Sequence, residues 1–375
     1  MIVAGEASGD LHGSKIARYL KRKNKDIHCL GMGSEKMRDA GVELLYDSAN
    51  IAVVGLWEVL KHWSDIQAAL RILKQQIVTN PPDLLLLIDY QEFNLKLAKF
   101  AKQHQVNVLF YVSPQLWAWR QGRIKNFINT VDMMAVIFPF EVTYYEKAGI
   151  PVRYVGHPLA NKVKASASKQ ALQTQFKLNP ETPTIALLPG SRRSEIKKIL
   201  PILLETAQLI TAKHSGAQFL LPLANPNFKQ YVVELSSQYQ CDIRILDGRA
   251  YDATYCSDAA CVASGTATLE VALLQTPMAI VYQVSALSYA ILRRLIKVPY
   301  VGLANIIAGD LVAPEFIQDK ADPNQIAAEI IRLLEDQDYC QLRKNALQQV
   351  SAKIGDSDGI AGISDLALEM LEKDI

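Results

Sequence analysis

The sequence predicts an α/β protein built from two parallel-sheet domains. Short, continuously apolar segments such as 84–88, 184–188 and 278–282 are typical of strands buried on both faces of a parallel sheet. Segments with apolar residues at helical spacing alternate with such strands in both halves of the chain. The length of 375 residues exceeds what one core of ordinary size needs, so we expect two domains.

Composition narrows the class of protein. Half of the residues are hydrophobic and 21% are charged, as in a globular protein, and the formal net charge is only +2. That balance gives no electrostatic reason to expect nucleic acid as a partner. The five cysteines are scattered without metal-ligand spacing, which is typical of reduced thiols in a cytoplasmic protein. No apolar run approaches the length of a bilayer span, so the chain is expected to be soluble or peripheral.

The first element is a strand at 1–5, which runs into a glycine-containing turn and an amphipathic helix ending near Lys25. Such a turn faces the ligand in doubly wound folds, which makes Ser8, Gly9 and Asp10 candidate substrate-binding residues. The glycine spacing matches neither a dinucleotide-binding fingerprint nor a P-loop. We therefore expect no cofactor.

The segment 51–77 carries apolar residues at helical spacing together with basic side chains. One interpretation is a helix that buries a wide apolar face in the core. The other is an interfacial helix, because tryptophans and bases suit the headgroup region of an anionic membrane. The residues in question are Val53, Leu56, Trp57, Leu60, Trp63 and Ile66.

Strand 84–88 ends at Asp89, at the edge where α/β sheets present their ligands. Asp89 is therefore a candidate catalytic residue, with a helix N-cap as the alternative. The next strand, 108–112, leads to Trp119 and Arg120. These two side chains could stack on and bind a sugar or phosphate, or belong to a packed aromatic cluster capped by surface arginines.

A change in composition divides the chain. Residues 161–181 are rich in Lys, Ser, Gln and Asn, which places a domain boundary there. A C-terminal helix is expected to pack back on the first domain. The predicted parts are an N-terminal domain at 1–160, a C-terminal domain at 161–350 and the returning helix at 351–375.

Strand 184–188 ends in a turn that we expect to bind phosphate. The helix behind the turn offers unpaired N–H groups and the positive end of its dipole. Guanidinium groups match phosphate oxygens in geometry and charge. The alternative is an ordinary strand-to-helix turn with two solvated arginines. The candidate residues are Gly190, Ser191, Arg192 and Arg193.

A second turn of this kind contains Ser264, Gly265 and Thr266, and the helix behind it carries Glu270. A carboxylate at that place can accept hydrogen bonds from ribose hydroxyls, although the helix dipole would also favour a surface acid there. Two such turns and one placed acid predict a nucleotide diphosphate as ligand.

The remaining motifs are weaker. The basic amphipathic segment 289–297 could contact an anionic surface or form a solvated outer face. Asn305 is expected in a loop, 305–309, with its side chain toward a cleft. The Asp-x-Asp triplets 336–338 and 356–358 resemble the motif of metal-dependent transferases, but both lie at helix ends. Capping explains them better, so we expect no catalytic metal.

Several blocks, in this order along nearly the whole chain, resemble the lipid A disaccharide synthase family (glycosyltransferase family 19). Each block alone is weak, and their joint occurrence is specific. They are GEASGD at 5–10, YVSP at 111–114, WAWR at 117–120, FPFE at 138–141, VGHP at 155–158, LPGSR at 188–192 and SGTATLE at 264–270.

The resemblance implies a metal-independent glycosyltransferase of the B type, with two Rossmann-like domains facing a cleft and UDP on the second domain. The implied reaction is the inverting transfer of 2,3-diacylglucosamine from UDP-2,3-diacylglucosamine to 2,3-diacylglucosamine 1-phosphate (lipid X). The products are a β-1,6 disaccharide 1-phosphate and UDP. The family also implies a peripheral position on the inner face of the bacterial inner membrane, against anionic lipid, and a homodimer.

Individual residues take roles from the same resemblance. Asp89 matches the family's proposed general base, Arg192 its turn arginine, Glu270 its ribose-binding acid, and Asn305 its functional asparagine. The chain departs from the family at Ala304, where proline is frequent, and at Glu92, where aspartate is frequent. Alternatives are a UDP-sugar 2-epimerase of the same fold and a non-catalytic nucleotide-sugar-binding module.

Overall fold

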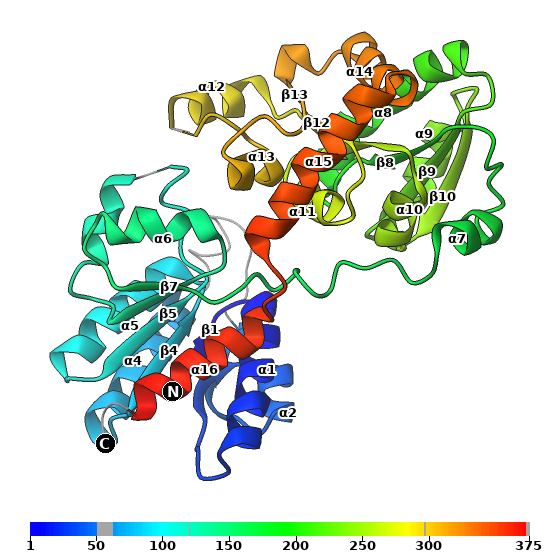
Figure 1. Cartoon of the computed structure of the whole chain (residues 1–375). Helices are drawn as coiled ribbons and strands as arrows, with labels where there is room; N and C mark the ends of the chain where they lie inside the picture. The colour runs from blue at the N-terminus through cyan, green and yellow to red at the C-terminus, as the bar shows by residue number, and fades with distance from the viewer. Residues whose placement is uncertain (51–62, 120, 296–297, 373–375) are drawn as a thin grey trace. The chain divides into compact units, whose positions relative to one another are not determined.

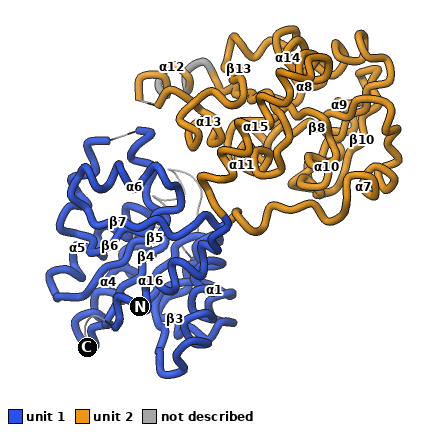
Figure 2. The backbone as a smooth tube through the Cα atoms, viewed as in Figure 1, with its two compact units in different colours: residues 1–158, 356–375 blue, residues 159–355 orange. Residues whose placement is uncertain are grey.

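The computed structural model describes residues 1–50, 63–119, 121–295 and 298–372 (Figure 1). The chain forms two compact units (Figure 2). Unit 1 comprises Met1–Pro158 and Asp356–Ile375, and unit 2 comprises Leu159–Gly355.

Unit 1 is built on a parallel sheet of seven strands in the order β3-β2-β1-β4-β5-β6-β7. The strands are β1 (Ile2–Ala4), β2 (Leu30–Gly33), β3 (Glu43–Asp47), β4 (Leu84–Ile88), β5 (Asn107–Tyr111), β6 (Met133–Val136) and β7 (Val152–Tyr154). The helices are α1 (Ala7–Lys23), α2 (Glu35–Asp39), α4 (Trp63–Thr79), α5 (Gln91–Gln103), α6 (Pro139–Glu146) and α16 (Gly359–Glu372).

Strand β4 shows why a central strand needs a continuous apolar run. Successive side chains point to opposite faces of a sheet, and both faces of this one are covered by helices. Leu85 and Leu87 join a core that includes residues of α4 and α5. Leu84, Leu86 and Ile88 join the other core, which includes residues of α1 and α16.

The C-terminal helix α16 packs beside α1 in unit 1 (Figure 1). The hydroxyl of Tyr19 donates to Asp365 over 2.8 Å. Gly362 allows the close approach, because a Cβ there would lie 2.1 Å from the carbonyl oxygen of Val155. The last helix of the chain is therefore part of the first sheet's core.

Unit 2 contains a parallel sheet of six strands in the order β10-β9-β8-β11-β12-β13. The strands are β8 (Thr184–Leu188), β9 (Gln218–Leu223), β10 (Asp242–Asp247), β11 (Ala259–Ala263), β12 (Met278–Tyr282) and β13 (Glu315–Ile317). The helices are α7 (Lys169–Gln175), α8 (Arg193–Lys213), α9 (Lys229–Ser236), α10 (Ala250–Cys256), α11 (Thr266–Leu273), α12 (Ala286–Leu295), α13 (Leu303–Ala308), α14 (Pro323–Glu335) and α15 (Gln337–Ile354).

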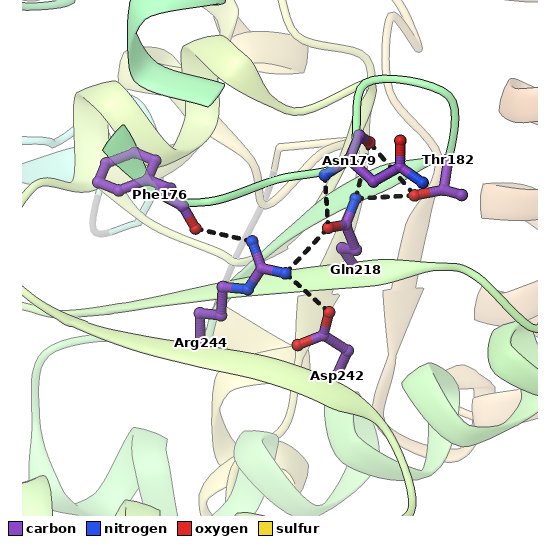
Figure 3. A network of polar contacts seen from close by, with 6 residues as sticks. All are labelled: Phe176, Asn179, Thr182, Gln218, Asp242 and Arg244. Carbon is purple, nitrogen blue, oxygen red and sulfur yellow. Dashed lines mark hydrogen bonds and ion pairs between the residues drawn. The ribbon is translucent and has the colours of Figure 1, made fainter. Parts of the chain in front are cut away.

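A polar network fastens the start of unit 2 to its sheet (Figure 3). The buried amide of Gln218 accepts from the backbone N–H of Asn179 and donates to the Asn179 carbonyl and the Thr182 hydroxyl. Arg244 donates to Gln218 over 2.9 Å and to the carbonyl of Phe176 over 2.7 Å. Gln218 takes part in all of these hydrogen bonds except the one from Arg244 to Phe176.

Replacing Gln218 should therefore destabilise unit 2. In Gln218→Ala the backbone groups of Asn179 and one Arg244 donor lose their partner, and we expect unfolding to become easier by about 2–4 kcal/mol. Urea unfolding followed by circular dichroism measures this. Gln230→Ala, an exposed glutamine on α9, is the matched control and should change stability little. Equal midpoints for the two variants would contradict the role of the network.

The Asp-x-Asp triplets are caps, as expected. Asp336 accepts from the N–H of Tyr339 over 3.0 Å, and Asp358 accepts from that of Ile360 over 2.9 Å. Within the described ranges, no group of three or more His, Cys, Asp and Glu side chains could hold a metal ion. The same ranges contain no helix with the length and apolarity needed to cross a membrane.

Candidate active site

A cavity of about 360 Å³ opens in unit 1 where β4 ends and α5 begins. Its lining combines apolar side chains with carboxylates, two side-chain amides and an ammonium group. A cavity of this mixed character suits an amphipathic ligand. Its lining residues are Glu6, Trp63, Ile66, Gln67, Leu70, Asp89, Tyr90, Gln91, Glu92, Phe93 and Lys96.

Asp89 lies in this cavity on a strained turn. Asp89 and Tyr90 have φ angles of 48° and 46°, in the left-handed region. The side chain of Asn94 supports the turn by donating to the Asp89 carbonyl over 2.6 Å. Gly5 leaves room for the Tyr90 ring, which a Cβ at that position would meet at 2.3 Å. Strain held in place by neighbours is typical of functional sites.

Burial raises the pKa of the Asp89 carboxyl above its usual value, and the negative charge of Glu6 raises it further. The register of the sheet explains why these two carboxylates lie close together. Ala4 of β1 lies opposite Ile88 of β4, so Glu6 and Asp89 follow adjacent strand ends. A carboxyl with a raised pKa in a cavity is a candidate acid or base.

The three candidate substrate-binding residues after β1 differ in exposure and in their hydrogen bonds. Ser8 is exposed on α1, whereas Gly9 is buried against Ala4. Asp10 is only 4% exposed. Its carboxylate accepts three backbone N–H bonds at 2.6–3.2 Å from the first turn of α2. The expectation that Asp10 binds substrate is corrected, because this carboxylate caps a helix.

The aromatic segment after β5 likewise contains one buried and one exposed tryptophan. Trp117 is buried and donates its indole N–H to Glu141, which also accepts from the hydroxyl of Ser113. Burial raises the pKa of Glu141 to about 7. Trp119 is 39% exposed and remains a candidate for stacking on a sugar. Arg120 lies outside the described residues.

In unit 2 the two glycine turns lie at one edge of the sheet. Strands β8 and β11 are adjacent and parallel, with Leu188 opposite Val262. The turns that follow them therefore open at the same edge. Gly190 has a φ of +99° and Gly265 a φ of +144°, where other residues would be strained. A Cβ at Gly265 would have no neighbour within 4 Å, so a ligand can approach the backbone there.

The turn at Gly190 differs from expectation in one respect. Glu195 accepts the backbone N–H groups of Ser191 and Arg192 over 3.0 and 3.2 Å. Those amides are therefore bonded to a carboxylate of the chain itself, and the prediction that they are open to phosphate is corrected. The side chain of Arg192 is 81% exposed, and Arg193 is exposed as well. The exposed guanidinium groups therefore remain the candidate anion-binding groups of this turn, although that of Arg192 also lies 3.6 Å from the Glu195 carboxylate.

The turn at Gly265 is tied to its surroundings by side chains. The Ser264 hydroxyl donates to the carbonyl of Val301 over 2.9 Å, and Thr266 is exposed. Glu270 accepts from the hydroxyl of Tyr251 over 2.9 Å. Burial and this carboxylate raise the pKa of Tyr251 to about 12. No sequence motif points to Tyr251, which lies on the short helix α10.

Asn305 does not lie in a loop. It belongs to α13 and is fully buried. Its amide donates to the carbonyl of Ala313 over 2.7 Å and to Glu315 over 2.8 Å, and its oxygen accepts from the Ala313 N–H. The expectation of a side chain facing a cleft is wrong. The catalytic role predicted for Asn305 stays a prediction.

Comparison of the whole chain with protein families identifies its family, which the geometry of the site alone does not. The family described as Lipid-A-disaccharide synthetase matches residues 1–358. The chain belongs to this family. The lipid-A-disaccharide synthase of Geobacter sulfurreducens is 46% identical over 375 residues, which span 100% of this chain and 98% of the relative. As a member of the lipid-A-disaccharide synthetase family, the protein is a glycosyltransferase.

Solved structures agree on the fold. The crystal structure of the glycotransferase of kitacinnamycin has a TM-score of 0.64 at 12% identity, and the match covers 98% of each chain. A UDP-GlcNAc 2-epimerase from Neisseria meningitidis, solved bound to UDP-GlcNAc, has a TM-score of 0.60 at 15% identity and covers 99% of each chain. These likenesses concern the fold alone. They confirm the predicted two-sheet fold of B-type glycosyltransferases for this chain.

Proposed function

We propose that this enzyme transfers 2,3-diacylglucosamine from UDP-2,3-diacylglucosamine to 2,3-diacylglucosamine 1-phosphate, with inversion at the anomeric carbon. The observation that supports this most is the Asp89 cavity, which combines a carboxyl of raised pKa with apolar lining residues. An acceptor that is part sugar and part acyl chain needs both features. The paired turns of unit 2 supply a second, separate set of groups suited to a diphosphate.

Asp89 acts as the general base in this proposal. Its carboxylate takes the proton of the acceptor's 6-hydroxyl while that oxygen attacks the anomeric carbon of the donor. A base works best when its pKa lies near the working pH, and the burial of Asp89 shifts its pKa in that direction. The left-handed turn fixes the direction in which the carboxylate points.

The departing UDP is held by unit 2. Arg192 and Arg193 stabilise the charge that builds on the diphosphate, and the turn at Ser264–Thr266 contributes its exposed backbone. Glu270, oriented by the Tyr251 hydroxyl, accepts hydrogen bonds from the ribose. The epimerase of the same fold was solved with a UDP-sugar, which supports this class of ligand.

One experiment tests the function directly. UDP release is measured with UDP-2,3-diacylglucosamine alone and after addition of the acylated acceptor. We expect release only with acceptor, together with a disaccharide product detected by mass spectrometry. Epimerised UDP-sugar would indicate the epimerase alternative, and binding without any product would indicate a non-catalytic module.

The raised pKa of Asp89 gives a pH prediction. The base must be deprotonated, so kcat/KM should fall on the acid side with the pKa of Asp89. Glu6→Gln removes a negative charge that favours the protonated form, so the acid limb should move to lower pH. The measurement is the pH profile of kcat/KM, with Glu146→Gln, an exposed acid on α6, as control. An unmoved limb would exclude Glu6 as the cause.

We also propose attachment to an anionic membrane surface, because both substrates are acylated. Trp63 is 50% exposed at the start of α4, and Arg293, Arg294 and Leu295 are exposed on α12. Aromatic and basic side chains of this kind suit the headgroup region. Leu56, Trp57 and Leu60, which the sequence assigns to the same surface, lie outside the described residues.

Trp63→Ser should weaken sedimentation with vesicles that contain anionic phospholipid. We expect a loss of roughly three- to tenfold in the partition coefficient, because part of one aromatic side chain no longer enters the lipid. Val78→Ser is the matched control, since Val78 is 54% exposed at the other end of the same helix. Equal partition of the two variants would place Trp63 away from the membrane.

A further inference from the structure

The ammonium group of Lys96 has no function in the reaction described so far. Lys96 is exposed on α5 and lines the same cavity as Asp89. Its nitrogen lies 5.4 Å from the ring centroid of Trp63. It forms no ion pair with any residue in the described part of the chain. A cation–π contact at an exposed site is weak, so a stronger anionic partner can displace it.

The other charged side chains among the described lining residues are acidic. Glu6, Asp89 and Glu92 line it, and of these Glu92 is ion-paired with Arg123. Lys96 is the only cationic side chain among the described lining residues. A ligand that carries a negative charge is repelled by Glu6 and Asp89 and needs a cation to compensate.

The geometry allows Lys96 to serve that purpose. Side chains of an α-helix tilt toward its N-terminus, and Lys96 lies five residues after Gln91, where α5 begins at the cavity. The next exposed lysine of α5, Lys99, does not line the cavity, and Lys102 is ion-paired with Asp132. The position of Lys96 on the helix therefore distinguishes it from its neighbours.

We propose that Lys96 binds the phosphate monoester of the acceptor sugar and so determines that the acceptor is phosphorylated. This inference rests on the proposed function, since it assigns a residue to the acceptor of that reaction. An ammonium group at the cavity forms a charge-assisted hydrogen bond with the phosphate. The hydroxyl to be deprotonated then lies toward Asp89, and the acyl chains lie along Ile66, Leu70 and Phe93.

The experiment compares two acceptors, 2,3-diacylglucosamine 1-phosphate and 2,3-diacylglucosamine without its phosphate. Both are dispersed in non-ionic detergent, so that no anionic lipid can act as a source of phosphate. For Lys96→Gln we expect kcat/KM to fall about 10- to 100-fold with the phosphorylated acceptor, mainly through KM. With the other acceptor the change should stay within about twofold, because no charge-assisted bond is lost.

Two further variants sharpen the result. Lys99→Gln removes the same charge one turn away and should leave both acceptors unaffected. Lys96→Arg restores the charge and should recover part of the preference for phosphate. Lys96 is exposed, so its replacement should not unfold the protein. Unchanged kinetics of Lys96→Gln, or an equal loss with both acceptors, would overturn the assignment.

A binding measurement separates this inference from the proposed reaction. Glucosamine 1-phosphate is titrated into wild-type protein and into Lys96→Gln, with the dissociation constant as readout. A larger dissociation constant for Lys96→Gln than for the wild type supports the phosphate site even if no disaccharide forms. In that case only the proposed reaction fails. Equal binding overturns the site even if the wild type turns over normally.

Discussion

Asp89→Asn is expected to lower kcat by about 10²- to 10⁴-fold, the usual range for loss of a general base. Asparagine tolerates the left-handed conformation nearly as well as aspartate, so the turn at φ 48° should survive the change. The KM values for both substrates should change little, because the amide keeps the size and polarity of the carboxyl. Steady-state UDP release with both acylated substrates measures the effect.

The control for this variant is Asp83→Asn. Asp83 is exposed at the other end of the strand that carries Asp89, so its amide variant should retain full turnover. Turnover of Asp89→Asn within a few-fold of wild type would remove Asp89 from the mechanism. A thermal midpoint equal to that of wild type shows that a low rate does not come from a misfolded turn.

Arg192→Ala should reduce kcat by about 10²- to 10³-fold, the effect of removing one preorganised donor to a developing negative charge. The side chain is 81% exposed and contacts Glu195 only over 3.6 Å, so its loss should not disturb α8. UDP should also inhibit the variant more weakly, because the same guanidinium binds the product. Rates and inhibition constants from UDP-release assays test both effects.

Lys197→Ala is the matched control for Arg192→Ala. Lys197 is exposed one turn further along α8, away from the glycine turn, and its loss should leave kcat unchanged. A similar decrease in both variants would indicate a general electrostatic effect of unit 2. Full activity of Arg192→Ala would remove Arg192 from the mechanism.

The turn at Gly190 shows why the available hydrogen-bond donors of a site are hard to predict. Glu195 was visible in the sequence three residues after Arg192, at the spacing of a capping box. That spacing predicts acceptance of backbone N–H groups, which the structure shows at Ser191 and Arg192. The position of Glu195 in the sequence therefore already indicates that these amides are occupied.

The sequence by itself predicted the longer apolar strands, their parallel arrangement and the sheet edge at which the two glycine turns lie, whereas β2, β3 and β13 appear only in the structure. Leu84–Ile88 is apolar at every position because both faces of β4 are covered, and that requirement is local. The strand that follows Asp83 thus predicts the place of Asp89 at the carboxyl edge. The glycines at 190 and 265 are likewise required by their own backbone angles.

Only the tertiary structure decided which polar side chains remain available for a ligand. Asp10 is bound to the N–H groups of Ser34, Lys36 and Met37, and Asn305 to Ala313 and Glu315. The strength of a carboxylate or an amide as a ligand depends on whether its hydrogen bonds are already satisfied. Those partners lie many residues away, so no local pattern could reveal that the side chains of Asp10 and Asn305 are bonded to other parts of the chain, whereas that of Asp89 lines a cavity.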